Sequence, residues 1–296
     1  MDKKTIKKYI GNLNEIKSFL EEFLKNPDGV DFSSDVNEEN RLKEFTELRM
    51  MAKSNRWPEA VPGDFICENK EEEKLQRAQG IIFDFELPEN LNFLDFGCGE
   101  GHVAFLKSLN SKKSIGFDLK DQNWSHFEKK ENLIFSTNWD EIEKNGPYDI
   151  ILCNDVLDHA KDPLEELKKI QKVKTPEIGK IFVRIHPWTS RHGSHLYKEL
   201  NKAYLQLVFS EDELFVMGIE QEKINKTLDP AKYYKDLFKQ VGFTVLKEEA
   251  IDEIAEDIFS YDGPIRKRIQ SNWPEETRYE DIIKIIEIQF LDFTLI

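Results

Sequence analysis

Residues 93–106 read FLDFGCGEGHVAFL, and this short stretch decides the fold of the chain. Its apolar start ends at three alternating glycines, Gly97, Gly99 and Gly101, and a helix-like pattern of apolar residues follows them. Glycine allows left-handed turns and lets a ligand approach the main chain closely. A strand, a glycine turn and a helix in this order predict a Rossmann-like α/β fold that holds a ligand against bare backbone.

The spacing and charge of this turn discriminate between two common ligands, a dinucleotide and S-adenosylmethionine. The dinucleotide fingerprint is G-x-G-x-x-G, whereas the third glycine here comes one residue early. Asp95 precedes the turn and Glu100 lies within it, and carboxylates there would repel a pyrophosphate. They are compatible with the ammonium and sulfonium groups of S-adenosylmethionine, which is therefore the expected ligand.

Outward from the turn, strand and helix patterns alternate. The expected strands are residues 92–96, 114–118, 132–136, 148–153, 179–186 and 243–248, and a last strand lies within 285–296. The clearest helix between them is 162–173, where Asp162 is suited to cap the helix and Pro163 to its first position. This alternation predicts a mostly parallel sheet that binds its ligand at the carboxyl ends of the strands.

Further helical patterns flank this core. They cover residues 4–25, 41–53, 70–82, 196–208 and 230–241, and a polar linker is expected at 26–40. The stretch between residue 248 and the last strand is too long for a hairpin turn. The predicted organisation is an N-terminal helical extension or cap at 1–88, a methyl-donor-binding core at 89–250, and, at 251–296, an insertion that is a candidate substrate lid, followed by the final strand.

The composition limits the partners. The 296 residues carry a net charge of −15, which argues against nucleic acid because proteins that bind it present basic faces to phosphates. No apolar run is long enough to span a membrane, and no signal-peptide pattern is present. The three cysteines are scattered and lack zinc-site spacing. A cytoplasmic protein with a small-molecule substrate and no resident metal is expected, and the oligomeric state is left open.

Polar and aromatic residues follow the ends of the predicted strands, where a ligand would lie. Asp118 ends the second strand, and its carboxylate can accept hydrogen bonds from both ribose hydroxyls. Asn138 and Trp139 follow the third strand, where an amide can read the adenine edge and an indole can pack on its face. Asn154 and Asp155 follow the fourth strand, beside the expected reacting centre.

These segments resemble the class I S-adenosylmethionine-dependent methyltransferases. The resemblance is carried by LDFGCGEGHVA, GFDLKD, YDIILCNDVLDHAKDPLEELKKI and GKIFVRIHP, and covers residues 90–187 by motif. It implies a seven-stranded sheet with helices on both faces and an antiparallel last strand, and S-adenosylmethionine as cofactor. Many members have an acid where Asn138 stands. The expected cofactor-binding residues are Asp95, Gly97, Cys98, Gly99, Gly101, Asp118, Leu119, Asn138, Trp139 and Asn154.

Methyl transfer is an in-line displacement, and a hydroxyl acceptor must also lose its proton. Members that methylate nucleobase amines often carry Asn/Asp-Pro-Pro-aromatic after the fourth strand, whereas residues 154–157 read NDVL, which disfavours that substrate. Histidine is the natural general base near neutral pH. His186 and His192, in the stretch RIHPWTSRHGSH, are therefore the expected catalytic residues together with Asp155, and His195 is expected to contact the substrate.

Three arginines suggest an anionic acceptor, because guanidinium groups bind phosphate or carboxylate through paired hydrogen bonds. Arg191 lies in the histidine-rich stretch, and Arg266 and Arg268 lie in the predicted insertion. The expected acceptor is a sugar or phosphorylated glycan precursor, methylated on oxygen, which would place the enzyme in glycan biosynthesis.

Three alternatives stay open at this level. The first is a carboxyl- or N-methyltransferase of a small metabolite. The second is a regulatory protein that binds the donor without catalysis. The third is a nucleic-acid methyltransferase, which a concentrated basic surface would indicate. For the chemistry of the site, a divalent metal ion held by His186, His192 and His195 with Asp155 or Asp158 is the alternative to a histidine base.

Overall fold

The computed structural model describes residues 35–54, 57–62, 71–220, 224–252 and 264–296. The chain divides into two compact units, residues 1–51 and 52–296. The expected helix at 4–25 lies outside the described residues. The linker expected at 26–40 is wrong from residue 35 onward, because α2 runs from Asp35 to Ala52. The sequence at 35–39 reads DVNEE, and acidic residues favour a helix N-terminus.

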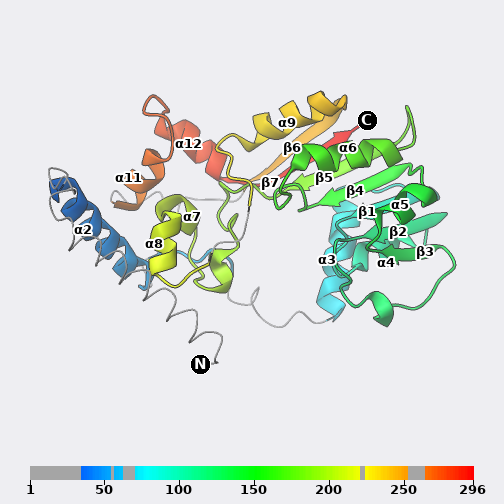
Figure 1. Cartoon of the computed structure of the whole chain (residues 1–296), viewed down its shortest axis with the longest axis horizontal. Helices are drawn as coiled ribbons and strands as arrows, with labels where there is room; N and C mark the ends of the chain where they lie inside the picture. The colour runs from blue at the N-terminus through cyan, green and yellow to red at the C-terminus, as the bar shows by residue number, and fades with distance from the viewer. Residues whose placement is uncertain (1–34, 55–56, 63–70, 221–223, 253–263) are drawn as a thin grey trace, which may run out of the picture. The chain divides into compact units, whose positions relative to one another are not determined.

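The larger unit contains a seven-stranded sheet in the order β3-β2-β1-β4-β5-β7-β6 (Figure 1). Strands β1 to β5 pair in parallel, and β7 runs antiparallel to both β5 and β6. This confirms the predicted seven-stranded sheet with an antiparallel last strand. The strands are β1 (Asn92–Phe96), β2 (Lys113–Phe117), β3 (Leu133–Ser136), β4 (Ile150–Asn154), β5 (Lys180–Ile185), β6 (Val245–Asp252) and β7 (Ile288–Leu295).

Helices cover both faces of the sheet, as expected (Figure 1). Asp162 and Asp229 cap α6 and α9 through their side chains, each followed by a proline in the first turn. The helices are α3 (Glu71–Asp84), α4 (His102–Lys107), α5 (Trp139–Asn145), α6 (Pro163–Val173), α7 (Leu205–Val208), α8 (Glu211–Val216), α9 (Pro230–Val241), α11 (Pro264–Ser271) and α12 (Tyr279–Ile286), with the 3-10 turns η4 (Trp124–His126) and η5 (Leu196–Lys198).

The alternation of side chains along the strands divides the core into two layers. Leu94 and Phe96 of β1 join the main core with residues of α5, α6 and α9. Phe93, on the opposite face of β1, packs with residues of α3 and α4. Because α3 contributes to this second layer, it belongs to the larger unit, and the predicted boundary at residue 88 falls inside that unit.

The prediction of one helix over 196–208 is wrong for the middle of this range. Only η5 and α7, at its two ends, are helical. Tyr204 takes a left-handed conformation between them, and its N–H donates to the carbonyl of Arg191. The side chain of Asn201 accepts hydrogen bonds from the N–H groups of Ala60 and Val61, both at 3.0 Å. Contacts with residues distant in sequence therefore overrode the local helical pattern.

The insertion between β6 and β7 contributes α11 and α12. α11 lies beside α7 (Figure 1), and the hydroxyl of Tyr204 donates to the carbonyl of Ile286 at the end of α12. The insertion is thus packed on the segment that follows β5. Among the residues that the structure describes, no helix combines the length and apolar character that crossing a bilayer requires.

Candidate active site

The glycine turn between β1 and α4 leaves one open position. Gly97, Gly99 and Gly101 have positive φ angles of 77°, 50° and 87°. A Cβ on Gly97 would lie 2.3 Å from Val156, and one on Gly101 would lie 2.5 Å from Phe135. A Cβ on Gly99 would meet no described atom within 4 Å. The turn therefore presents bare backbone at Gly99, where a ligand can approach.

The carboxylate of Asp118 is held against this turn. Its Oδ2 accepts a hydrogen bond from the N–H of Gly99 at 2.9 Å, and its Oδ1 accepts a longer one from the N–H of Lys120 at 3.3 Å. The indole N–H of Trp124 donates to the carbonyl of Gly99 at 2.8 Å. Asp118 thus keeps lone pairs for ribose hydroxyls at the end of β2, whereas the side chain of Leu119 is 79% exposed.

Two stacked aromatic rings back the turn, and sequence analysis does not anticipate them. The rings of Trp124 and Phe135 lie 5.2 Å apart and nearly parallel. A Cβ on Gly101 would touch both rings. Phe135 pairs in register with Gly116 of β2, where a Cβ would lie 2.6 Å from the Phe135 ring. The glycine in β2 is the sequence signal for this aromatic backing.

The residues expected to contact adenine already make contacts within the fold. Asn138 caps α5, because its Oδ1 accepts a hydrogen bond from the N–H of Asp140 at 3.0 Å. The Trp139 ring packs edge-on against Phe117, and its indole N–H donates to Glu143 at 2.8 Å. Their contacts with adenine stay predictions.

Asp95 and Cys98 support the glycine turn between β1 and α4. Asp95 is buried, and the backbone N–H of Ala104 in α4 donates to its carboxyl group. Burial raises the pKa of Asp95 from 3.8 to about 7. Burial, together with Asp95 and Asp118, raises the pKa of the Cys98 thiol well above its usual value, so the thiol stays protonated.

The end of β4 carries a strained acid beside a buried ion pair. Asp155 has a φ angle of +52°, and its Oδ2 accepts a hydrogen bond from Asn154 at 3.0 Å. Burial raises its pKa to about 7, although Arg184 opposes this change. Arg184 holds the carboxylate of Asp292 through two hydrogen bonds of 2.8 and 2.6 Å. Neither Oδ1 of Asp155 nor Oδ1 of Asn154 has a hydrogen-bond partner among the described residues.

The histidines that follow β5 form a cluster. The ring centroid of His186 lies 4.3 Å from that of His192 and 5.4 Å from that of His195. Burial, followed by the neighbouring histidines, holds the pKa of His186 well below 6.5, and burial lowers the pKa of His192 to about 4. Both rings are therefore neutral at pH 7. The amide nitrogen of Gln289 lies 2.9 Å from Nδ1 of His192.

The cluster extends to the loop after β4 through His159. The ring of His159 lies 4.9 Å from that of His195, and its Nε2 lies 3.5 Å from the buried carboxyl group of Asp158. Burial raises the pKa of Asp158 well above 3.8. Among the described residues, the histidines after β5 do not bring three ligand atoms within reach of one ion.

The three arginines expected to bind an anionic substrate all contact the chain itself. Arg191 donates two hydrogen bonds to the carbonyl of Glu59, at 2.9 and 2.7 Å. Arg268 forms an ion pair with Glu213 at 3.1 Å. The guanidinium group of Arg266 lies 3.8 Å from the centre of the Tyr279 ring. Their predicted role toward a substrate stays a prediction.

A comparison with models of known protein families identifies the family of this chain. The family model of the methyltransferase domain matches residues 69–248, which is more than half of the chain. The chain belongs to the class I S-adenosylmethionine-dependent methyltransferases. It is thus an enzyme, S-adenosylmethionine is its methyl donor, and the resemblance stated from the sequence motifs is confirmed.

Several known methyltransferases are similar to this one. The ubiquinone biosynthesis O-methyltransferase of Vibrio cholerae is 23% identical over 252 residues, which cover 81% of this chain and 91% of that protein. A solved putative S-adenosylmethionine-dependent methyltransferase from Listeria monocytogenes has a TM-score of 0.46 at 14% identity, over 76% of this chain and 98% of that one. One from Mesorhizobium loti has a TM-score of 0.44 at 12% identity, over 74% of this chain and 97% of that one.

The residues of this methyltransferase fit its donor. The open backbone at Gly99 and the carboxylate of Asp118 lie together, as an adenosyl group requires. Asn154 ends β4 and Asp155 follows it, and each has a buried oxygen without a hydrogen-bond partner among the described residues. Such acceptor atoms suit a ligand that carries an ammonium group and a positive sulfur.

Proposed function

We propose that this methyltransferase acts on a hydroxyl oxygen of a small-molecule acceptor, with His186 as the general base. The observation that carries the proposal is the state of the His186 side chain. It is buried just past the end of β5, and its Nε2 has no hydrogen-bond partner among the described residues. Burying a polar atom without a partner costs free energy, so this atom is explained if an acceptor hydroxyl supplies the missing hydrogen bond.

The donor supplies a methyl group that its sulfonium has already activated. The protein must place the acceptor oxygen in line with that methyl group and take the proton that the oxygen loses. His186 is neutral at pH 7 because its pKa is low, so it can accept this proton. An oxygen that has begun to bond to carbon carries positive charge and is strongly acidic. A weak base therefore suffices.

The neighbouring rings position His186 and limit the cluster to one proton. The His192 ring, 4.3 Å away, contacts the Gln289 amide. A second proton at this distance would repel the first strongly in a buried site. The proton taken by His186 must therefore leave before the next turnover.

For the acceptor class, we propose a neutral hydroxyl compound. The name of the Vibrio cholerae relative, an O-methyltransferase of ubiquinone biosynthesis, supports transfer to oxygen. A sugar hydroxyl is our narrower prediction. The phosphorylated glycan precursor expected from the sequence has lost its support, because Arg191, Arg266 and Arg268 make internal contacts. Phenols and catechols should accordingly be screened beside sugars and sugar nucleotides.

The test is methyl transfer from donor with a labelled methyl group to panels of phenols, sugars, sugar nucleotides, amines and carboxylates. With the acceptor found, His186→Ala should lower kcat about 100-fold or more, the range expected for loss of a general base, and leave affinity for S-adenosylhomocysteine nearly unchanged. His159→Ala is the matched control, because it removes a ring from the same cluster without removing the base. Equal losses in both variants, or transfer only to amines, would refute the assignment of the base.

A further inference from the structure

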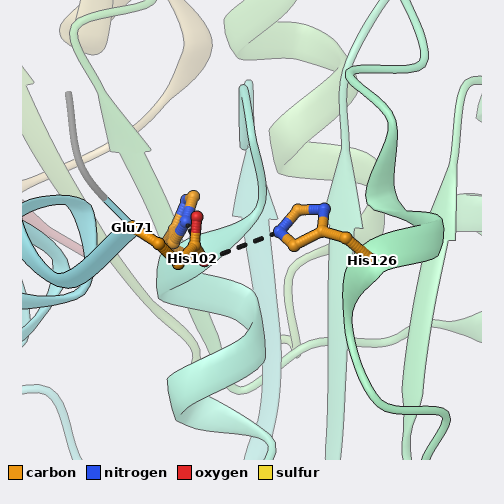
Figure 2. Close-up of side chains that lie close together, drawn as sticks. All are labelled: Glu71, His102 and His126. Carbon is orange, nitrogen blue, oxygen red and sulfur yellow. Dashed lines mark hydrogen bonds and ion pairs between the residues drawn. The ribbon is translucent and has the colours of Figure 1, made fainter. Parts of the chain in front are cut away.

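A second cluster of ionisable side chains lies at α3, α4 and η4, apart from the histidines that follow β5. Glu71 begins α3, His102 begins α4 directly after Gly101, and His126 ends η4. Figure 2 shows the three side chains converging from these elements. One potential ligand atom from each lies within 4.8 Å of the other two. His102 is buried, whereas Glu71 and His126 are exposed.

The hydrogen bonds of His126 indicate which of its nitrogens is available. Its Nδ1 lies 2.7 Å from the backbone carbonyl of Asn123. A carbonyl only accepts hydrogen bonds, so Nδ1 carries a proton and the lone pair of the neutral ring is on Nε2. That Nε2 lies 3.6 Å from Oε1 of Glu71. Two electron-rich atoms therefore face each other, and a positive charge between them, a proton or a metal ion, would resolve the repulsion.

The distances suit a tetrahedral ion. Zinc lies about 2.0–2.1 Å from nitrogen and oxygen ligands, so two ligand atoms in a tetrahedron are about 3.3–3.4 Å apart. The separation between His126 and Glu71 is 3.6 Å, and that between Nε2 of His102 and Glu71 is 2.9 Å. The 2.9 Å contact is a hydrogen bond whose proton a metal ion would displace. Small side-chain movements would therefore complete the geometry.

The surroundings favour a cation and leave room for a further ligand. The three residues line a cavity of about 540 Å³, which can hold a water molecule as the fourth ligand. Glu100 and Glu128 line the same cavity and add negative charge, of which Lys74 offsets part by pairing with Glu100. The contact between His126 and the Asn123 carbonyl is also the kind of outer contact that orients histidines bound to metals.

We propose that Glu71, His102 and His126 bind one divalent transition-metal ion, with zinc the best match to a ligand set of two histidines and one carboxylate. The ion joins α3, α4 and η4. It acts on the donor site through the backbone, because His102 follows Gly101 directly and Trp124 of η4 donates to the carbonyl of Gly99. Its role is to stiffen the glycine turn, and metal and donor should each strengthen binding of the other.

The first test is titration of the tag-free full chain with Zn²⁺ by calorimetry and with Co²⁺ by visible absorption, which reports tetrahedral coordination. We expect one ion per chain. His126→Asn and Glu71→Gln should each weaken binding at least tenfold, and both residues are exposed, so the fold should be kept. Glu128→Gln is the matched control, because it removes the same charge from the same cavity. It should weaken binding less than threefold.

Three results would overturn the proposal. The first is the absence of binding below millimolar Zn²⁺. It would mean that a proton, and not a metal ion, lies between Nε2 of His126 and Oε1 of Glu71. The second is an equal loss of affinity in Glu128→Gln, which would indicate diffuse attraction. The third is binding that survives in His126→Asn but is lost in His192→Ala, which would place the ion in the histidine cluster. If the proposal holds, Zn²⁺ should also raise affinity for S-adenosylhomocysteine in the wild type and not in His126→Asn.

Discussion

At the scale of single residues, the glycine turn separates structural from ligand-binding requirements. Gly101→Ala places a Cβ 2.5 Å from Phe135 at a φ angle of +87°. Backbone strain and overpacking together should lower the free energy of unfolding by about 2–4 kcal/mol. Gly99→Ala meets open space, so it should cost only about 1 kcal/mol for its left-handed backbone. Its methyl group would instead occupy donor space and weaken donor binding more than tenfold.

Chemical denaturation and calorimetric titration with S-adenosylhomocysteine measure both quantities on the two variants. A stable Gly99→Ala protein with unchanged affinity would show that the donor does not approach this backbone. A Gly101→Ala protein as stable as the wild type would show that the Phe135 ring can move aside. The structural role of Gly101 and the ligand-binding role of Gly99 are inferred from the space around each Cβ position. The sequence motif does not distinguish them, because its three glycines look equivalent.

At the scale of elements, β1 and α4 are joined through a buried carboxyl group whose charge depends on pH. Burial raises the pKa of Asp95 from 3.8 to about 7 in the folded protein, so the folded state binds its proton more tightly than the unfolded chain. The proton on Asp95 therefore stabilises the folded state. This stabilisation is complete below pH 4 and is lost as the pH rises to about 7. Asp95→Asn keeps an acceptor for the N–H of Ala104 and carries no charge.

The variant should therefore gain stability relative to the wild type between pH 5 and pH 8, by up to a few kcal/mol. Thermal unfolding at both pH values measures this difference, and comparison with the wild type cancels the other titrating groups. A constant difference between the two proteins would mean that Asp95 is ionised in the fold throughout this range.

Sequence patterns predict elements well where the local signals agree. The helix at 162–173 has a cap, a proline and an apolar stripe, and α6 confirms it. The pattern at 196–208 has the stripe alone, and Asn201 there binds the backbone of Ala60 and Val61 instead of continuing a helix. The same limit applies to the site. Asp118 is expected from its place after a strand, whereas Trp124 is brought to Gly99 by the path of a loop.

At the scale of the whole larger unit, a segment before the sheet supports the loop that carries the histidine cluster. Residues 57–62 contact the chain that follows β5 at several points. The indole N–H of Trp57 donates to the carbonyl of Ala203 at 2.8 Å, and Arg191 donates to the carbonyl of Glu59. Since Arg191 directly precedes His192 in the chain, the position of the cluster depends on this early segment.

Asn201 is the residue through which this dependence can be tested. Its side chain accepts hydrogen bonds from the N–H groups of Ala60 and Val61 and donates to the carbonyl of Val61 at 2.8 Å. Asn201→Ala leaves these partly buried groups without partners and should lower the free energy of unfolding by about 2–3 kcal/mol. Asn201→Asp keeps both acceptor contacts but sets a carboxylate oxygen against the carbonyl of Val61, so it should also lower the free energy of unfolding. Because the histidine cluster loses its support, kcat should fall in Asn201→Ala while affinity for S-adenosylhomocysteine, bound at the glycine turn, stays within twofold. A parallel loss of donor affinity would mean instead that the early segment supports the whole carboxyl edge of the sheet.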